Sequence, residues 1–158
     1  MLFLKKLLVH CSYDDDIGYL CRRSGRNDIN TDVLELREFS ASSKMGCKIN
    51  SLKNKRGKLG LRNISLDEYD TVIFACEEWM GVVPPVLNSF IENSDLRFKN
   101  VVCIVFGNGS FAKKAADGLR VKVALSGGTV KNAITVSAKA LKTCDEDVLF
   151  YVRHKLAV

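Results

Sequence analysis

The segment from Tyr69 to Ser110 constrains the fold of this chain more than any other. It contains two short, continuous apolar runs, Thr71–Cys76 and Val101–Phe106, as expected of strands buried on both faces of a sheet. Between them, Pro84 and Pro85 open a helix, because a missing N–H costs little in the first helical turn. Two parallel strands joined by a helix form a right-handed crossover. The segment therefore predicts the centre of an α/β sheet.

Apolar periodicity and turn residues divide the rest of the chain into further strands and helices. The predicted strands are Leu2–His10, Asp32–Glu38, Thr71–Cys76, Val101–Phe106 and Thr129–Ser137. The predicted helices are Ile17–Arg23, the segment after Pro84, Phe111–Leu125 with Ser110 as its N-cap, and a final helix after Thr143. Polar Ser24–Asn30, which contains Gly25, is predicted to be a loop. This alternation predicts one domain over residues 1–158, a three-layer α/β/α sandwich around a five-stranded parallel sheet.

A basic insertion, residues 40–65, interrupts this alternation. From Phe39 to Leu66 there is no acid, and the cations are Lys44, Lys48, Lys53, Lys55, Arg56, Lys58 and Arg62. We interpret the insertion as irregular. It is either a solvated loop or a contact, over Lys44–Arg62, for an acidic partner or an anionic ligand. No aromatic residue lies between these charges to stack on bases, which argues against nucleic acid.

The cysteines and the apolar runs bear on localisation. Six cysteines in a chain with no recognisable secretory signal favour reduced thiols, so we expect a cytoplasmic protein. Cys11, Cys76 and Cys103 lie in or at the ends of predicted strands and are most simply small core residues. No apolar run approaches the roughly 20 residues that span a membrane, so we expect no membrane contact.

In a parallel sheet, ligands bind beyond the carboxyl ends of the strands, where the strand order reverses. Three loops follow predicted strands at that edge and define a candidate site. Its residues are Ser12, Tyr13, Asp14, Asp15, Asp16, Ile17, Glu77, Glu78, Trp79, Met80, Gly81, Gly107, Asn108, Gly109, Ser110 and Phe111.

The central segment resembles the flavodoxin-like family. The resemblance is carried by Tyr69-Asp70 before the third strand, Trp79-x-Gly81 after it, Pro84-Pro85, and Asn88-Ser89-Phe90-Ile91 in the helix. It implies the strand order 2-1-3-4-5 and a site for FMN (flavin mononucleotide) formed by the three loops. It also implies that Trp79 stacks on the flavin ring and that the glycines of Gly107–Phe111 let the backbone approach the ring edge. From the residues alone, Trp79 is equally a packing residue.

The first loop departs from the resemblance. Family members cradle the phosphate with a loop rich in serine, threonine and glycine, and only Ser12 matches that pattern here. Asp14, Asp15, Asp16 and Ile17 occupy the remaining positions. Like charges about 4 Å apart, at an effective dielectric near 20, cost on the order of 4 kcal/mol per pair. This degenerate loop therefore opposes a phosphate dianion.

Three functions remain open. The first is FMN-dependent electron transfer with a redox partner protein, the chemistry being the cofactor's. The second is a flavin-free scaffold that uses the basic insertion for interaction or regulation. The third is a Mg²⁺ site like that of a receiver domain, using Asp14–Asp16, Glu77 and Glu78 with Ser110 and Lys139. Neither histidine has a serine or cysteine partner at a readable spacing, so no catalytic residue is assigned.

Overall fold

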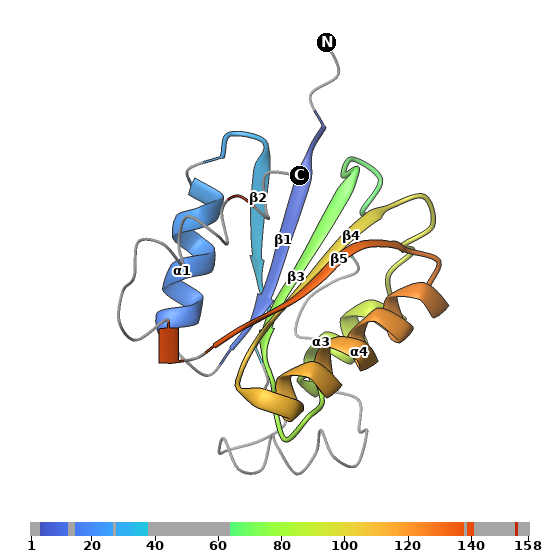
Figure 1. The fold of residues 1–158 in the computed structure, drawn as a ribbon. Coiled ribbons are helices and arrows are strands. Elements are labelled where there is room, and N and C mark those ends of the chain that lie inside the picture. Colours follow the sequence, from blue (N-terminus) through green and yellow to red (C-terminus); the bar gives the residue numbers. More distant parts are fainter. Residues whose placement is uncertain are drawn as a thin grey trace.

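The computed structural model describes residues 4–12, 15–26, 28–37, 64–137, 139–140 and 154. These residues form five strands and three helices, with a short helical piece at residues 139–140 (Figure 1). In chain order the elements are β1 (Lys6–Cys11), α1 (Asp15–Arg26), β2 (Thr31–Glu35), β3 (Thr71–Glu77), α3 (Pro85–Glu92), β4 (Asn100–Phe106), α4 (Gly109–Leu125) and β5 (Thr129–Val136).

The five strands form one parallel sheet in the order β2-β1-β3-β4-β5. The order confirms the predicted 2-1-3-4-5 arrangement. The chain leaves β1 toward β2 on one side and continues from β3 toward β4 and β5 on the other. The strand order therefore reverses between β1 and β3, which places the expected binding edge at their carboxyl ends.

Helices cover both faces of the sheet, as the three-layer prediction requires. Figure 1 shows α1 on one face and α3 with α4 on the other. Alternate residues of β1 pack in the cores on the two faces of the sheet, because successive side chains of a strand point to opposite faces. Leu7 and Val9 belong to the cluster under α3 and α4, whereas Leu8 packs with Ile17 and Leu20 of α1.

The central strands are buried and the edge strand β2 is partly exposed. All seven residues of β3 are buried, in agreement with its continuous apolar sequence. Cys11, Cys76 and Cys103 are buried, which confirms their prediction as core residues. Burial raises the pKa of the Cys103 thiol to about 12, so this group stays protonated and unreactive.

Two helix boundaries were predicted wrongly. The loop expected from Ser24 is still helix, because α1 continues to Arg26. Gly25 lets α1 lie directly on β2, since a Cβ there would overlap the side chain of Val33. Ser110 is not an N-cap either: α4 begins at Gly109, and its capping position has no side-chain cap hydrogen bond.

The predictions for residues 40–63 and for the helix after Thr143 lie outside the described residues, apart from His154. Among the helices that the structure describes, none combines the length and hydropathy needed to cross a bilayer.

Candidate functional site

The carboxyl ends of β1, β3, β4 and β5 meet at one edge of the sheet. The strand register sets Cys11 opposite Cys76 and Glu77 opposite Phe106. Backbone hydrogen bonds continue beyond the strands. Glu78 N–H donates to the Phe106 carbonyl, and Gly107 N–H donates to the carbonyl of Val136 at the end of β5, both at 2.9 Å. The second and third loops are therefore held side by side, and the first leaves the same edge.

The second loop, Glu77–Gly81, is a tight and fully bonded turn. Trp79 and Val82 exchange backbone hydrogen bonds of 2.8 and 3.3 Å, with Met80 and Gly81 between them at φ of +57° and +82°. Positive φ at both central positions is the type I′ geometry, which glycine adopts without strain and methionine does not. Glu78 Oε2 also accepts the Gly81 N–H at 2.9 Å. The result is a tightly hydrogen-bonded loop with the Met80 side chain exposed.

Trp79 is buried in this turn. Its side chain is 0% exposed, and its indole N–H donates to Glu77 Oε1 at 2.9 Å. Both faces of the ring are thus covered in this conformation, which corresponds to the packing role left open by the sequence. Stacking of Trp79 on a ligand requires the turn to open, and it stays a prediction.

The third loop, Gly107–Phe111, is open to solvent at its centre. A Cβ on Gly107 would overlap Glu78 Cγ, so the glycine allows the second and third loops to touch. A Cβ on Gly109 would meet nothing within 4 Å. Asn108 and Ser110 are exposed on either side of it. Asn108 Oδ1 accepts a hydrogen bond from Ser137 Oγ at 2.9 Å, which ties this loop to the end of β5.

Within the described parts of the three loops, Phe111 is an exposed aromatic side chain at this edge. It is 56% exposed, and a Cβ on Gly81 would lie 3.1 Å from its ring. Met80 within the second loop and Phe111 beside it therefore give this loop an apolar surface. The sequence placed Phe111 in the site only as the end of a loop. The resemblance favoured Trp79 over it as the aromatic that stacks on the ring.

The first loop contributes a half-buried Ser12 and the start of α1. Ile17 is 2% exposed within the core cluster of α1, so its side chain packs against the sheet and does not face a ligand. Asp16 is exposed in the first turn of α1. Tyr13, Asp14 and the side chain of Asp15 lie outside the described residues.

The carboxylates of the second loop are engaged in the turn itself. Glu77 accepts from Trp79, and Glu78 accepts from Gly81. Among the described residues, no group of three histidine, cysteine, aspartate or glutamate side chains could hold a metal ion. The magnesium hypothesis also needs Asp14, which is not described, and it stays untested.

Models of known protein families and curated protein sequences give no match to this chain. Several solved structures are similar to this chain. A flavoprotein from Lactobacillus acidophilus NCFM in complex with FMN is 12% identical, with a TM-score of 0.70 over 89% of this chain and 98% of that chain. The general stress protein 14 from Treponema denticola, in complex with FMN, is 11% identical, with a TM-score of 0.59 over 96% of each chain.

A flavodoxin from Streptococcus pneumoniae TIGR4 is 17% identical, with a TM-score of 0.55 over 96% of this chain and 97% of that chain. At such identities the likeness concerns the fold. Together with the strand order and the layers, it shows that this chain has a flavodoxin-like α/β fold.

Proposed function

We propose that this protein binds FMN at the carboxyl edge of the sheet. The observation that carries the proposal is the presence of two exposed apolar side chains, Met80 and Phe111, beside open glycine backbone at the carboxyl ends of β3 and β4, next to the point where the strand order reverses. A flat, largely apolar ring needs such apolar walls with a few backbone donors between them. The structural neighbours that contain FMN support the same cofactor.

The described residues fit the ring half of FMN better than the phosphate half. Phe111 and Met80 would contact the ring, and the backbone around Gly109 would donate to its edge. The N-terminus of α1 and Ser12 would receive the phosphate, since helix N-termini attract anions. Asp16 opposes this, because its carboxylate lies exposed in the first turn of the same helix. We therefore expect binding dominated by the ring.

When bound, FMN would supply the redox chemistry, and the protein would hold the ring and set its surroundings. Electron transfer to a redox partner protein is the function we propose for this arrangement. We also propose a cytoplasmic location, because the described cysteines are buried in the core as thiols, which suits a reducing compartment.

A flavin-free scaffold is the second candidate, and the burial of Trp79 favours it. A fully covered indole that is hydrogen-bonded to Glu77 has no face available to stack on a flavin ring. In this case the fold would serve an interaction, for which the basic segment Lys44–Arg62, outside the described residues, remains the proposed contact for an acidic partner.

A pair of alanine variants on one helix tests the FMN site. Phe111→Ala removes the apolar wall and should weaken FMN by roughly 1–3 kcal/mol through lost burial and stacking. Val121→Ala is the matched control, because Val121 is 59% exposed on the same helix, about 15 Å along its axis. FMN fluorescence quenching measures both dissociation constants. Equal affinities for the two variants would remove Phe111 from the site.

A further inference from the structure

The outer face of α4 carries an excess of positive charge. Its exposed charged side chains are three cations and one acid, namely Lys113, Lys114, Arg120 and Asp117. The remaining cation of the helix, Lys122, is half-buried toward α3, where it donates to Asn88 Oδ1 and interacts with the charge of Glu92. The neighbouring strand β5 adds the exposed Lys131 and contains no acid. This face of the molecule is therefore net positive.

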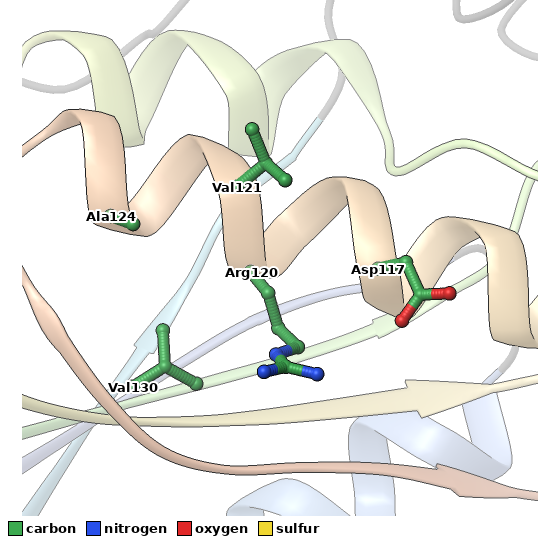
Figure 2. Close-up of a pocket in the computed structure, with 5 residues that line it drawn as sticks. All are labelled: Asp117, Arg120, Val121, Ala124 and Val130. Atoms are coloured by element: carbon green, nitrogen blue, oxygen red, sulfur yellow. The ribbon is translucent and has the colours of Figure 1, made fainter.

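A groove of about 360 Å³ lies on this face, between α4 and the edge strand β5. Its lining is Asp117, Arg120, Val121, Ala124 and Val130. In Figure 2, Arg120 extends from α4 toward Val130 of β5, and Val121 points the other way. Within the described part of the chain, neither Asp117 nor Arg120 forms an ion pair. The groove thus presents a guanidinium with apolar side chains beside it.

Such a groove is suited to a carboxylate. The guanidinium of Arg120 offers its N–H groups as a fork that bonds both oxygens of one carboxylate. The apolar lining keeps water from part of the contact, which strengthens a charge-assisted hydrogen bond. Lys113 lies two turns before Arg120, about 10 Å along the helix axis, and Lys114 follows it. The face therefore matches a partner that carries several carboxylates.

Apolar side chains run along the outside of α4 beside these cations. Val121 is 59% exposed and Leu125 is 84% exposed. An apolar centre with a charged rim is the usual anatomy of a contact between two proteins. A helix that lies on a membrane inserts a continuous apolar face, and that face of α4 is already buried on the sheet. A second copy of the chain would bring the same cations against each other, so we expect a different, acidic protein.

The basic face reaches the candidate flavin site. A Cβ on Gly81 would lie 3.1 Å from the ring of Phe111 and 3.2 Å from Lys114 Cδ. The stem of Lys114 therefore lies against the second loop, beside the exposed aromatic side chain. A protein that covers Lys114 consequently stands next to the edge of the sheet where FMN is proposed to bind.

We propose that an acidic redox protein docks on this basic face of α4, formed by Lys113, Lys114, Arg120, Val121 and Leu125. One carboxylate of the partner enters the groove and bonds Arg120, and further carboxylates meet the two lysines. That the partner is a redox protein rests on the proposed electron transfer. That it is acidic rests on the charges of the face alone.

Binding of an acidic [2Fe–2S] ferredoxin tests the proposal. Isothermal titration calorimetry at about 20 mM salt should give a dissociation constant of roughly 10–100 µM, as in weak redox contacts. Salt at about 200 mM should weaken binding on the order of tenfold through screening. Arg120→Gln should weaken binding about three- to tenfold, and Arg120→Lys less, because lysine keeps the charge but loses the fork. Asp117→Asn should strengthen binding roughly twofold, since it removes the acid of the face.

Arg23→Gln is the matched control. It makes the same charge change at an exposed position of α1, on the opposite face of the sheet (Figure 1), and should bind ferredoxin as the wild type does. All of these side chains are exposed, so circular dichroism should show unchanged folding. Equal effects of Arg23→Gln and Arg120→Gln would overturn the proposal, because net charge and not this face would then direct binding.

The titration is made on the purified protein before and after addition of FMN. Ferredoxin binding without any quenching of flavin fluorescence would leave the docking surface in place and refute the FMN site. Flavin quenching without ferredoxin binding at roughly 500 µM and low salt would overturn the docking surface alone. Binding to phosphatidylserine vesicles that depends on Arg120, with none to ferredoxin, would also overturn it.

Discussion

Glu77 Oε1 accepts a hydrogen bond from the indole N–H of Trp79 at 2.9 Å, and both side chains are buried. The two residues lie at the end of the central strand, where a ligand is expected. Their bond closes the second loop on itself. The loop therefore presents Met80, and not the tryptophan, to the outside.

Replacing Trp79 tests this closed loop. Trp79→Phe removes the indole donor to Glu77 and part of a fully buried ring, so we expect the free energy of unfolding to fall by about 2–3 kcal/mol. Glu77→Gln keeps an acceptor oxygen and should cost less than about 1 kcal/mol. Urea denaturation followed by circular dichroism measures both changes. A loss for Glu77→Gln as large as that for Trp79→Phe would contradict this account, in which ring burial dominates.

Gly107 is predicted to be intolerant of any side chain. Gly107→Ala would overlap Glu78 Cγ and lie 3.2 Å from the Ala112 Cβ, so we expect a loss of about 1–3 kcal/mol from overpacking. Gly118→Ala is the control, because a Cβ there meets nothing within 4 Å and alanine favours helix. Thermal unfolding should shift down for the first variant and up for the second. A neutral Gly107→Ala would mean that the two loops separate easily.

His10 is predicted to make stability depend on pH. It is buried in β1, and neither ring nitrogen has a hydrogen-bond partner within the described residues. Burial lowers the pKa of His10, the Glu35 carboxylate opposes that shift, and Arg22 adds to it. The unfolded chain, with an ordinary pKa of about 6.5, therefore binds a proton before the folded chain does.

The stability of the protein should therefore fall at low pH. The contribution of His10 to the free energy of unfolding is fully present above a pH of about 6.5 and is lost as the pH falls toward the lowered pKa of the folded state. His10→Leu removes the titrating group, so its unfolding free energy should change less between pH 7.5 and pH 5 than that of the wild type. Parallel slopes for the two proteins would contradict this assignment.

Asp16 is predicted to weaken FMN through its charge. Asp16→Asn removes one exposed negative charge from the first turn of α1, where a phosphate would bind. We expect FMN to bind more tightly by up to about 1 kcal/mol, since solvent screens an exposed group. Riboflavin, which lacks the phosphate, should bind both proteins equally. An equal gain for riboflavin would show that Asp16 acts elsewhere than at the phosphate.

The central sheet was predictable because its strands are buried on both faces. Thr71–Cys76 and Val101–Phe106 can only be central strands, and the proline pair fixes the start of α3. The end of α1 was not predictable, because Gly25 signals a loop in sequence. Only the approach of Val33 from β2 explains a glycine inside that helix.

The candidate site stays a prediction, but part of its layout was predictable from the sequence. The order of elements fixes which loops share an edge, and the second and third loops touch there. Which aromatic faces outward depends on the type I′ turn at Met80 and Gly81, a detail of backbone geometry. The sequence motif favours Trp79 as the stacking residue, because a motif carries no information on side-chain direction. In the structure the turn directs the indole inward, where it bonds to Glu77.

The most direct test is titration of the purified protein into FMN while the flavin fluorescence is recorded. The account predicts saturable, one-to-one quenching with a dissociation constant of roughly 1–10 µM, or about 7–8 kcal/mol of binding free energy. The one tryptophan of the chain provides a second signal from the same loop. Flavin fluorescence that stays unchanged at roughly 100 µM protein, ten times the upper predicted constant, would contradict FMN binding and leave the flavin-free scaffold in its place.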